Sequence, residues 1–397
     1  MPAPRSPLFT AHFLLMCGFS FTVFMSAFQL FPTAPFRILE LGGTNAHAGM
    51  FLGLLTYSSA FSAPFTGALA DRLGRARMLV VCSLVIALFA VAYALATSYR
   101  VLLLIAIAQG VFWSGLLSAS AAYVVGMIPE ERRAEGIAYW GLSTIFAVAF
   151  APSIGLWIYR RGGWPMVCAS IGVLNLTMGA IAARLPETTE RRRGLRAIAR
   201  RLSAGGLPSP ASFLEWRVLV MSFTLFLYAF GYGAITSFAA LYATSRGAPA
   251  GLYFTVLAIA IVATRPFSAP LADRIGHKKV LVPCLALLVV GLALLAVGGE
   301  PRWIVASALA FGCGFGSAYP VYAAYVTRGV IPARRGAAFG SIIAAMDTGI
   351  GTGSMSAGWI IEHGTFERAF GVAAAVAALS IPYFLLMDRV VHHGDSQ

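Results

Sequence analysis

The chain has 397 residues, of which 59% are hydrophobic and 11% are charged, and its formal net charge is +14. Soluble domains carry about 25% charged residues, so this composition excludes an ordinary soluble protein and is also too apolar for a disordered one. The basic residues lie in short clusters between long apolar runs, not along a polar face. This layout excludes a nucleic-acid partner and predicts an all-α polytopic protein of the lipid bilayer.

Apolar runs of about 20 residues are long enough to cross a bilayer as helices, and charges, prolines and glycine clusters divide this chain into twelve such runs. The first run is too long for the core of a signal peptide and has no small-residue cleavage site, so we expect it to be retained. The predicted spans are 8–34, 47–70, 78–97, 101–127, 136–159, 164–183, 217–243, 250–272, 280–298, 303–327, 337–361 and 367–387.

The distribution of Lys and Arg predicts how these spans are oriented. The termini and the loops after even-numbered spans hold 21 of them, whereas the opposite loops hold seven. Basic residues mark the cytoplasmic side. We therefore predict a multi-pass protein of the plasma (inner) membrane with both termini in the cytoplasm.

The sequence contains an internal repeat with an offset of 202 residues. Residues 64–80 match residues 266–282 at nine of 17 positions. An offset that covers six spans keeps their orientation, so the repeats are parallel and the binding site is expected where the halves meet. We predict a six-helix bundle over 1–184, a cytoplasmic linker over 185–216 and a second six-helix bundle over 217–397. The linker is either a short amphipathic helix on the inner leaflet or a solvated charged segment.

The segment after the second span resembles the loop motif G-x-L-a-D-r-x-G-r of the major facilitator superfamily, and a degenerate copy follows the eighth span. The resemblance covers the whole chain and points most closely to the twelve-span drug:proton antiporter branch. It implies that Asp71 contacts the start of span eleven and holds the halves together on the cytoplasmic side, where a helix N-terminus favours a carboxylate. The alternative is that the arginines are only positive-inside charges. The motif residues are Gly67, Asp71, Arg72, Gly74, Arg75, Asp273, Arg274 and Gly276.

Two further motifs lie within spans. In span five, Ala147, Ala151, Pro152 and Gly155 resemble the antiporter motif g-x-x-x-G-P-x-x-G, with alanine replacing glycine twice. In span four, Gln109 and the glycine after it match the end of R-x-x-Q-G, but the arginine of that motif is absent.

Two charges lie deep inside the predicted spans, Asp347 and Arg265. Each costs at least about 2.5 kcal/mol at the bilayer centre and is a functional candidate by default. Counting from the inner interface places Arg265 at about 12 Å and Asp347 at about 18 Å. The repeat puts Ala63 and Ile145 at the equivalent positions. We predict that the two charges form one coupled unit at the transport site; the alternative is a structural ion pair within the second half.

Uncharged candidates for the cavity wall are two amides and several aromatic residues. Each aromatic residue is alternatively a packing or interface residue. Two glycine runs, 312–316 and 349–353, follow no strand, so we interpret them as sites of close helix packing and not as phosphate loops. The candidates are Gln29, Gln109, Trp113, Tyr228, Tyr232 and Tyr319.

These features predict a monomeric secondary transporter that exports small amphiphilic molecules by alternating access, driven by the proton gradient and with no cofactor or metal. An uncoupled facilitator or importer and a transport-inactive membrane receptor are the alternatives. An enzyme is not expected, because the histidines lie near span ends or in loops and no G-x-S-x-G motif occurs. The chain also lacks the phosphate-binding loop of ATP-driven transporters.

Overall fold

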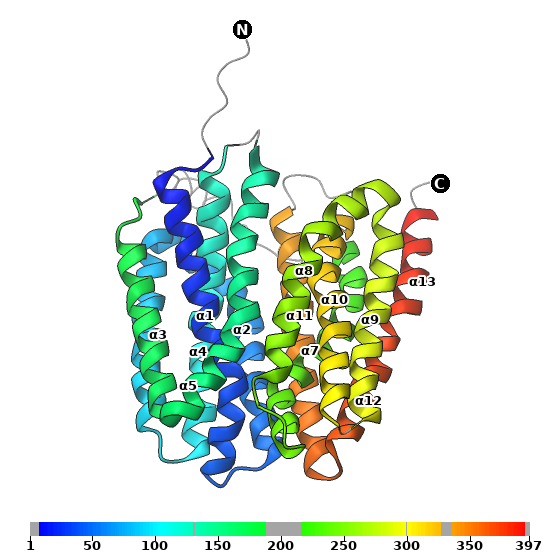
Figure 1. The fold of residues 1–397 in the computed structure, drawn as a ribbon. Coiled ribbons are helices and arrows are strands. Elements are labelled where there is room, and N and C mark those ends of the chain that lie inside the picture. Colours follow the sequence, from blue (N-terminus) through cyan, green and yellow to red (C-terminus); the bar gives the residue numbers. More distant parts are fainter. Residues whose placement is uncertain (1–7, 130–131, 188–215, 299, 327–334, 394–397) are drawn as a thin grey trace.

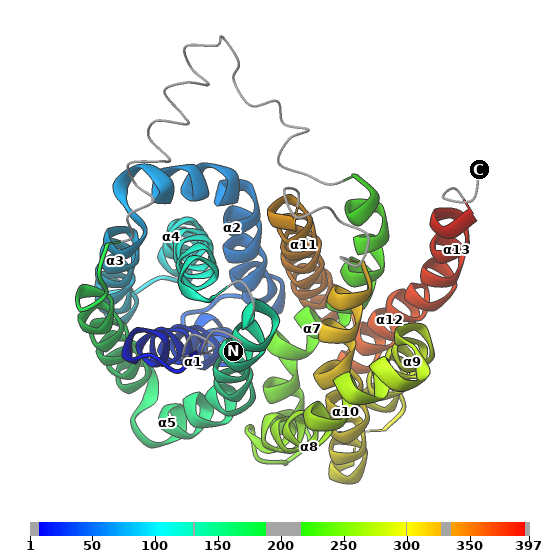
Figure 2. The same cartoon turned by 90° about the horizontal axis from the view of Figure 1, so that it is seen from above.

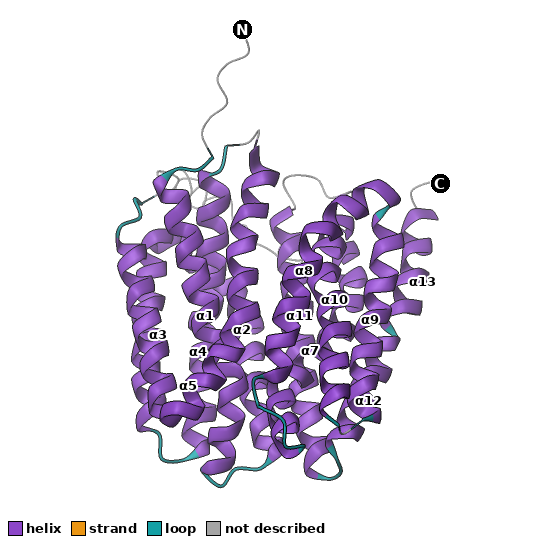
Figure 3. Ribbon diagram, viewed as in Figure 1, coloured by secondary structure: helices purple, strands orange, loops and turns teal. Residues whose placement is uncertain are grey.

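The computed structural model describes residues 8–129, 132–187, 216–298, 300–326 and 335–393. Within these ranges the secondary structure is helical, and short loops connect the helices (Figure 3). The described chain begins and ends on the same face of the molecule (Figure 1). We call this face the terminal face, and the other the opposite face.

The first half contains the helices before residue 187. Its last helix holds two crossings, because Gly163, with φ +65° and ψ −166°, reverses the chain inside it. That turn lies between the predicted fifth and sixth spans. The helices are α1 (Ala11–Glu40), α2 (Asn45–Leu73), α3 (Arg75–Leu95), α4 (Tyr99–Met127) and α5 (Arg133–Ala183).

The second half repeats this order after residue 216. Its last crossing is split at Leu379, because Pro382 has no N–H to donate to the carbonyl of Ala378. The helices are α7 (Trp216–Ser245), α8 (Leu252–Ile275), α9 (His277–Val297), α10 (Pro301–Val326), α11 (Arg335–Glu362), α12 (Phe366–Ala378) and α13 (Ser380–His393).

Side-chain caps explain where several of these helices begin. The hydroxyl of Thr10 accepts a hydrogen bond from the backbone N–H of Phe13 at the start of α1. Thr44 and His47 form a capping box at the start of α2, and Thr365 caps α12. Each cap satisfies an N–H group that the first turn leaves unpaired.

The twelve predicted spans are confirmed as crossings within the described residues, with two in α5 and one shared by α12 and α13. Eight helical stretches of the described chain are long and apolar enough to cross a membrane on that basis alone, counting α5 once. The long helices outside this set are α2, α8 and α11. All three pack against the other half and therefore expose less surface to lipid, so their side chains can be more polar than those of the other helices.

The halves lie side by side when viewed from the terminal face (Figure 2). Within them, α1 packs against α5 and α7 packs against α11, as the repeat predicts. The two most extensive helix pairs between the halves are α2 with α11 and α5 with α8, which are related by the same repeat, and α7 also contacts α1 and α2. The predicted linker lies largely outside the described residues.

The two glycine runs are sites of close helix packing, as predicted. A Cβ at Gly349 or Gly353 would lie 2.5 or 1.9 Å from a backbone oxygen of α7, whereas one at Gly351 would lie 2.4 Å from the Thr56 hydroxyl of α2. The alternate glycines therefore let α11 approach a helix of each half. In the other run, Gly314 approaches α9 in the same way.

Candidate functional site

The seam between α2 and α11 is closed at the opposite face. The backbone N–H of Asn45 donates to the Glu362 carboxylate at 2.9 Å, and the Ser354 hydroxyl donates to the carbonyl of Gly49 at 2.8 Å. A Cβ at Gly49 would lie 2.3 Å from the Ser354 carbonyl oxygen. Small residues therefore bring the two backbones into contact across the halves.

The same seam continues from the opposite face toward the middle of α2 and α11. The hydroxyls of Tyr57 and Thr352 lie 2.6 Å apart. Further toward the terminal face, Ser59 donates a hydrogen bond of 3.3 Å to Oδ2 of Asp347. Asp347 is partly buried at this point, so the predicted intramembrane acid lies on the surface where the halves meet.

Arg265 has a different environment. Its Nη1 donates to the carbonyl oxygen of Gly316 at 2.8 Å, which links α8 to α10. Within the described part of the chain no ion pair joins Arg265 to Asp347, and their action as one coupled unit stays a prediction. Tyr319 of α10 lies within electrostatic reach of both charges.

The two candidate amides lie away from the seam. Gln109 is 2% exposed, and its Oε1 accepts a hydrogen bond of 2.7 Å from the Tyr93 hydroxyl. Gln29 is equally buried and accepts 2.9 Å from Ser170. The structure places both inside the first half, where Gln109 accepts from a buried hydroxyl and Gln29 from a partly buried one, so their place in the cavity wall stays a prediction.

Of the candidate aromatic residues, Trp113 lies in the first half and the three tyrosines lie in the second. Trp113 packs edge-on against Phe24 within the first half. Tyr232 stacks on Phe315, with ring centroids 4.2 Å apart. The Tyr228 hydroxyl is buried and has no hydrogen-bond partner among the described residues. The partly exposed Tyr319 is the member of this set that lies nearest to the two intramembrane charges.

The antiporter-like motif of α5 is a helix-packing surface. Ala147 and Ala151 are fully buried against α1, and a Cβ at Gly155 would lie 2.7 Å from the Cα of Gln29. On another side of α5, the hydroxyls of Ser153 and Thr255 lie 3.0 Å apart and join α5 to α8. Pro152 is buried between these contacts.

The loop motif is a tight turn at the terminal face in both halves. Gly74 and Gly276 have φ of +103° and +98°, and Arg75 donates to the carbonyl of Ala122 at the end of α4 at 3.0 Å. At Gly67 a Cβ would meet its nearest neighbour, the side chain of Ser118, at 3.9 Å, so this glycine does not mark a close helix approach. Arg72 and Arg274 are exposed. The side chains of Asp71 and Asp273 lie outside the described set.

Sequence reasoning missed Ser59, the residue of α2 that faces Asp347. Serine is a common residue type and carries no charge, so nothing in composition distinguishes it. The glycine spacing did contain a signal, because Gly49 and Gly53 in α2 lie four residues apart and mark a face of close approach.

Two six-helix halves related by an internal repeat, with a carboxylate on the surface where they meet, are the arrangement of a secondary transporter. The family model described as Major Facilitator Superfamily matches residues 8–250 and 221–396. The chain therefore belongs to the major facilitator superfamily. It is a multi-pass membrane transporter and not an enzyme.

Among curated relatives, the chain is 24% identical over 368 residues to the staphylopine export protein of Staphylococcus aureus, which covers 90% of this chain and 89% of that protein. It is 26% identical over 395 residues to an uncharacterized MFS-type transporter of Burkholderia mallei, covering 96% and 93%.

Solved transporters share the fold. The nucleoside transporter NupG superposes with a TM-score of 0.72 at 16% identity, covering 95% of this chain and 99% of that chain. The peptide transporter POT superposes with a TM-score of 0.74 at 14% identity, covering 98% and 96%.

Proposed function

We propose that this transporter exports small amphiphilic molecules in exchange for protons, and that Asp347 is the group that carries the proton. The observation that carries the proposal is the hydrogen bond from Ser59 to Asp347, because it places a titratable group on the surface that must open and close. The similar staphylopine export protein supports the direction of transport. The excess of Lys and Arg on the terminal face supports a cytoplasmic location for that face.

The structure is closed at the opposite face, which is the outer face in this proposal. The hydrogen bonds that join the halves between described residues lie between that face and the level of Asp347. In an outward-open state the Ser59–Asp347 and Tyr57–Thr352 contacts must separate. Asp347 then loses its hydrogen bond from Ser59, and its exposure to solvent changes in the same step.

Protonation changes what Asp347 can do at the seam. The ionised carboxylate only accepts hydrogen bonds, whereas the neutral acid also donates one. A proton therefore has a different affinity for the two conformations, which is the requirement for a ligand to shift a two-state equilibrium. We assign Arg265 and Tyr319 to the same site, with Arg265 supplying positive potential that favours the ionised acid.

Everted membrane vesicles that hold a respiration-driven pH gradient test this proposal. A panel of amphiphilic cations, anions and neutral dyes is added, and dissipation of the gradient is read with a pH-sensitive fluorophore. The wild-type protein is expected to dissipate the gradient with at least one probe, and Asp347→Asn is expected to lower that rate at least about tenfold by removing the proton-carrying group.

The repeat offers a matched control. Ile145→Asn places the same amide at the equivalent position of the first half and is expected to retain coupling in proportion to the amount of folded protein. If the probe flux of the wild type does not depend on the pH gradient, the protein is an uncoupled facilitator. Unchanged pH-driven flux in Asp347→Asn would remove Asp347 from the coupling role.

A further inference from the structure

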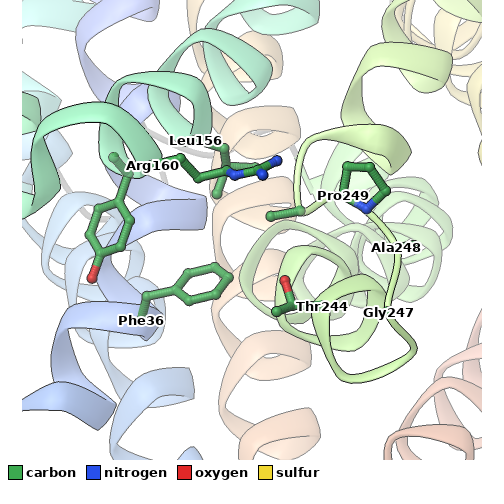
Figure 4. Close-up of a pocket in the computed structure, with 9 residues that line it drawn as sticks. Phe36, Leu156, Arg160, Thr244, Gly247, Ala248 and Pro249 are labelled. Carbon is green, nitrogen blue, oxygen red and sulfur yellow. The ribbon is translucent and has the colours of Figure 1, made fainter.

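A pocket of about 430 Å³ opens at the opposite face, away from Asp347, and both halves build it (Figure 4). The first half contributes the end of α1 and the part of α5 just before the Gly163 turn, and the second half contributes the end of α7 and the loop before α8. The volume lies in the range of small-molecule sites. Lining residues include Phe36, Leu156, Arg160, Thr244, Ala248 and Pro249.

Most of this lining is apolar, but one cation extends across it. The Arg160 side chain runs from α5 toward Pro249 (Figure 4). Leu156 is 1% exposed and Ala248 is 7% exposed, so these two residues are buried in the wall. A pocket with this lining fits a compact apolar group that carries a negative charge next to the guanidinium.

The neighbouring arginines already have partners. Arg37 forms an ion pair with Glu40 at 3.1 Å, Arg246 pairs with Glu367, and Arg161 lies over the ring of Trp157 at 5.3 Å. Among the described residues Arg160 makes no hydrogen bond, ion pair or ring contact. Arg160 is therefore the cation beside this pocket whose charge remains available to a ligand.

We propose that this pocket is a second ligand site, distinct from the transport site, for a small amphipathic anion, and that its occupant keeps the opposite face closed. A guanidinium favours a carboxylate or sulfonate through charge-assisted hydrogen bonds. Because the walls come from both halves, separation of the halves at this face takes the pocket apart. The anion therefore binds the closed conformation and acts as an inhibitor of the transport cycle.

Linkage sets the size of this effect. A ligand that binds one of two conformations shifts their ratio by the factor 1 + [L]/Kd, which is about 100-fold at a concentration of 100 Kd. The inference extends beyond the proposed export function and does not depend on which molecule is exported, because binding is measured without transport.

The first experiment measures binding to the full-length protein in lipid nanodiscs. The probe is 4-ethylbenzenesulfonate, which stays charged and crosses bilayers poorly, and the matched neutral compound is 4-ethylbenzenesulfonamide. Calorimetry is expected to show saturable binding of the sulfonate and at least about tenfold weaker binding of the sulfonamide, because a charge-assisted hydrogen bond is lost.

Two arginine variants distinguish binding in the pocket from nonspecific binding of the sulfonate to a basic surface. Arg160→Gln is expected to weaken sulfonate binding about tenfold or more, whereas Arg161→Gln, at the adjacent exposed arginine, is expected to leave it within about twofold. No saturable binding to the wild type, or equal losses in the two variants, would overturn the proposal.

The second experiment tests the link to conformation. Gly49 lies in the α2–α11 seam and does not line the pocket, and a side chain there collides with the Ser354 carbonyl. Gly49→Leu is therefore expected to disfavour closure and to weaken sulfonate binding, and Gly358→Leu, whose Cβ would lie 2.5 Å from the Asn45 carbonyl, is expected to do the same. Size-exclusion chromatography verifies that each variant is folded. Wild-type affinity in both folded variants would show that the pocket does not report closure.

Discussion

The two halves share a backbone plan but use different polar chemistry inside it. In the interior of the first half, neutral groups link the helices, such as Tyr93 with Gln109 and Asn175 with Ser26, whereas its charged links, such as Arg75 with the carbonyl of Ala122, lie near the faces. The second half has a charge in its interior as well as near the terminal face. Arg265 donates to a backbone carbonyl of α10, and Asp388 binds both Lys278 and Tyr325 near the terminal face.

This difference separates what the scaffold requires from what was added to it. Helix packing, tight turns and the inter-half contacts recur in both halves with an offset of 202 residues. The charges at 265 and 347 do not recur, since the first half has Ala63 and Ile145 there. A packed six-helix bundle can therefore form without them, which favours a functional origin for both.

A large stability effect is expected at Arg265. Arg265→Gln removes a charged hydrogen bond to Gly316 and is expected to lower the free energy of unfolding by about 1.5–3 kcal/mol. Combination with Asp347→Asn gives a double-mutant cycle, measured by titration with sodium dodecyl sulfate in mixed micelles. Because the two side chains make no direct ion pair, their coupling is expected to stay below about 1 kcal/mol. Coupling of more than about 2 kcal/mol would show that they form a pair in another conformation.

The buried amide of the first half gives the next effect. Tyr93→Phe leaves Oε1 of Gln109 without its donor and is expected to cost about 1–3 kcal/mol. Adding Gln109→Leu removes the unpaired oxygen and is expected to recover part of that loss. The set of probes that dissipate the pH gradient is expected to stay the same in the single and the double variant. A changed probe range with unchanged stability would return Gln109 to the transport site.

The sequence predicts the crossings and the repeat because composition and spacing contain both. It also predicts that Asp347 and Arg265 lie at similar depths, since depth follows from the rise per residue along a helix. Which neighbour each charge faces depends on the rotation of its helix, and one residue changes that direction by about 100°. Asp347 consequently faces Ser59 of α2, whereas Arg265 faces α10. The partners of the two amides could not be predicted for a related reason, because the hydroxyls that bind them come from other helices.

A pair of equivalent tyrosines near the terminal face compares the halves directly. Tyr123 donates to the backbone carbonyl of Pro186 at 2.8 Å, and Tyr325, 202 residues later, donates to the carboxylate of Asp388. Tyr123→Phe is expected to cost about 0.5–1.5 kcal/mol and Tyr325→Phe about 1 kcal/mol more, because its acceptor is charged. The same micelle titration measures both. Equal losses would show that the ion pair to Lys278 already satisfies the carboxylate.

The smallest expected difference lies between the two turn glycines, Gly74 and Gly276. Their backbones are nearly identical, with φ and ψ of +103° and 136° in one and +98° and 139° in the other. Alanine at either position enters a region of the Ramachandran plot that costs about 1–3 kcal/mol. The surroundings differ, because a Cβ at Gly74 would lie 2.1 Å from Oε1 of Glu187, whereas one at Gly276 has no neighbour within 4 Å.

Gly74→Ala is therefore expected to lower the free energy of unfolding by the shared backbone cost plus about 0.5 kcal/mol for displacing a flexible, solvent-facing side chain. Replacement of Glu187 by alanine provides the control, because it removes the obstacle without touching the turn. In that background Gly74→Ala and Gly276→Ala are expected to cost the same within error of the titration. A difference that persists after Glu187→Ala would mean that the two turns are unequal in the backbone itself, and the repeat would then be less symmetric at this loop than its dihedral angles indicate.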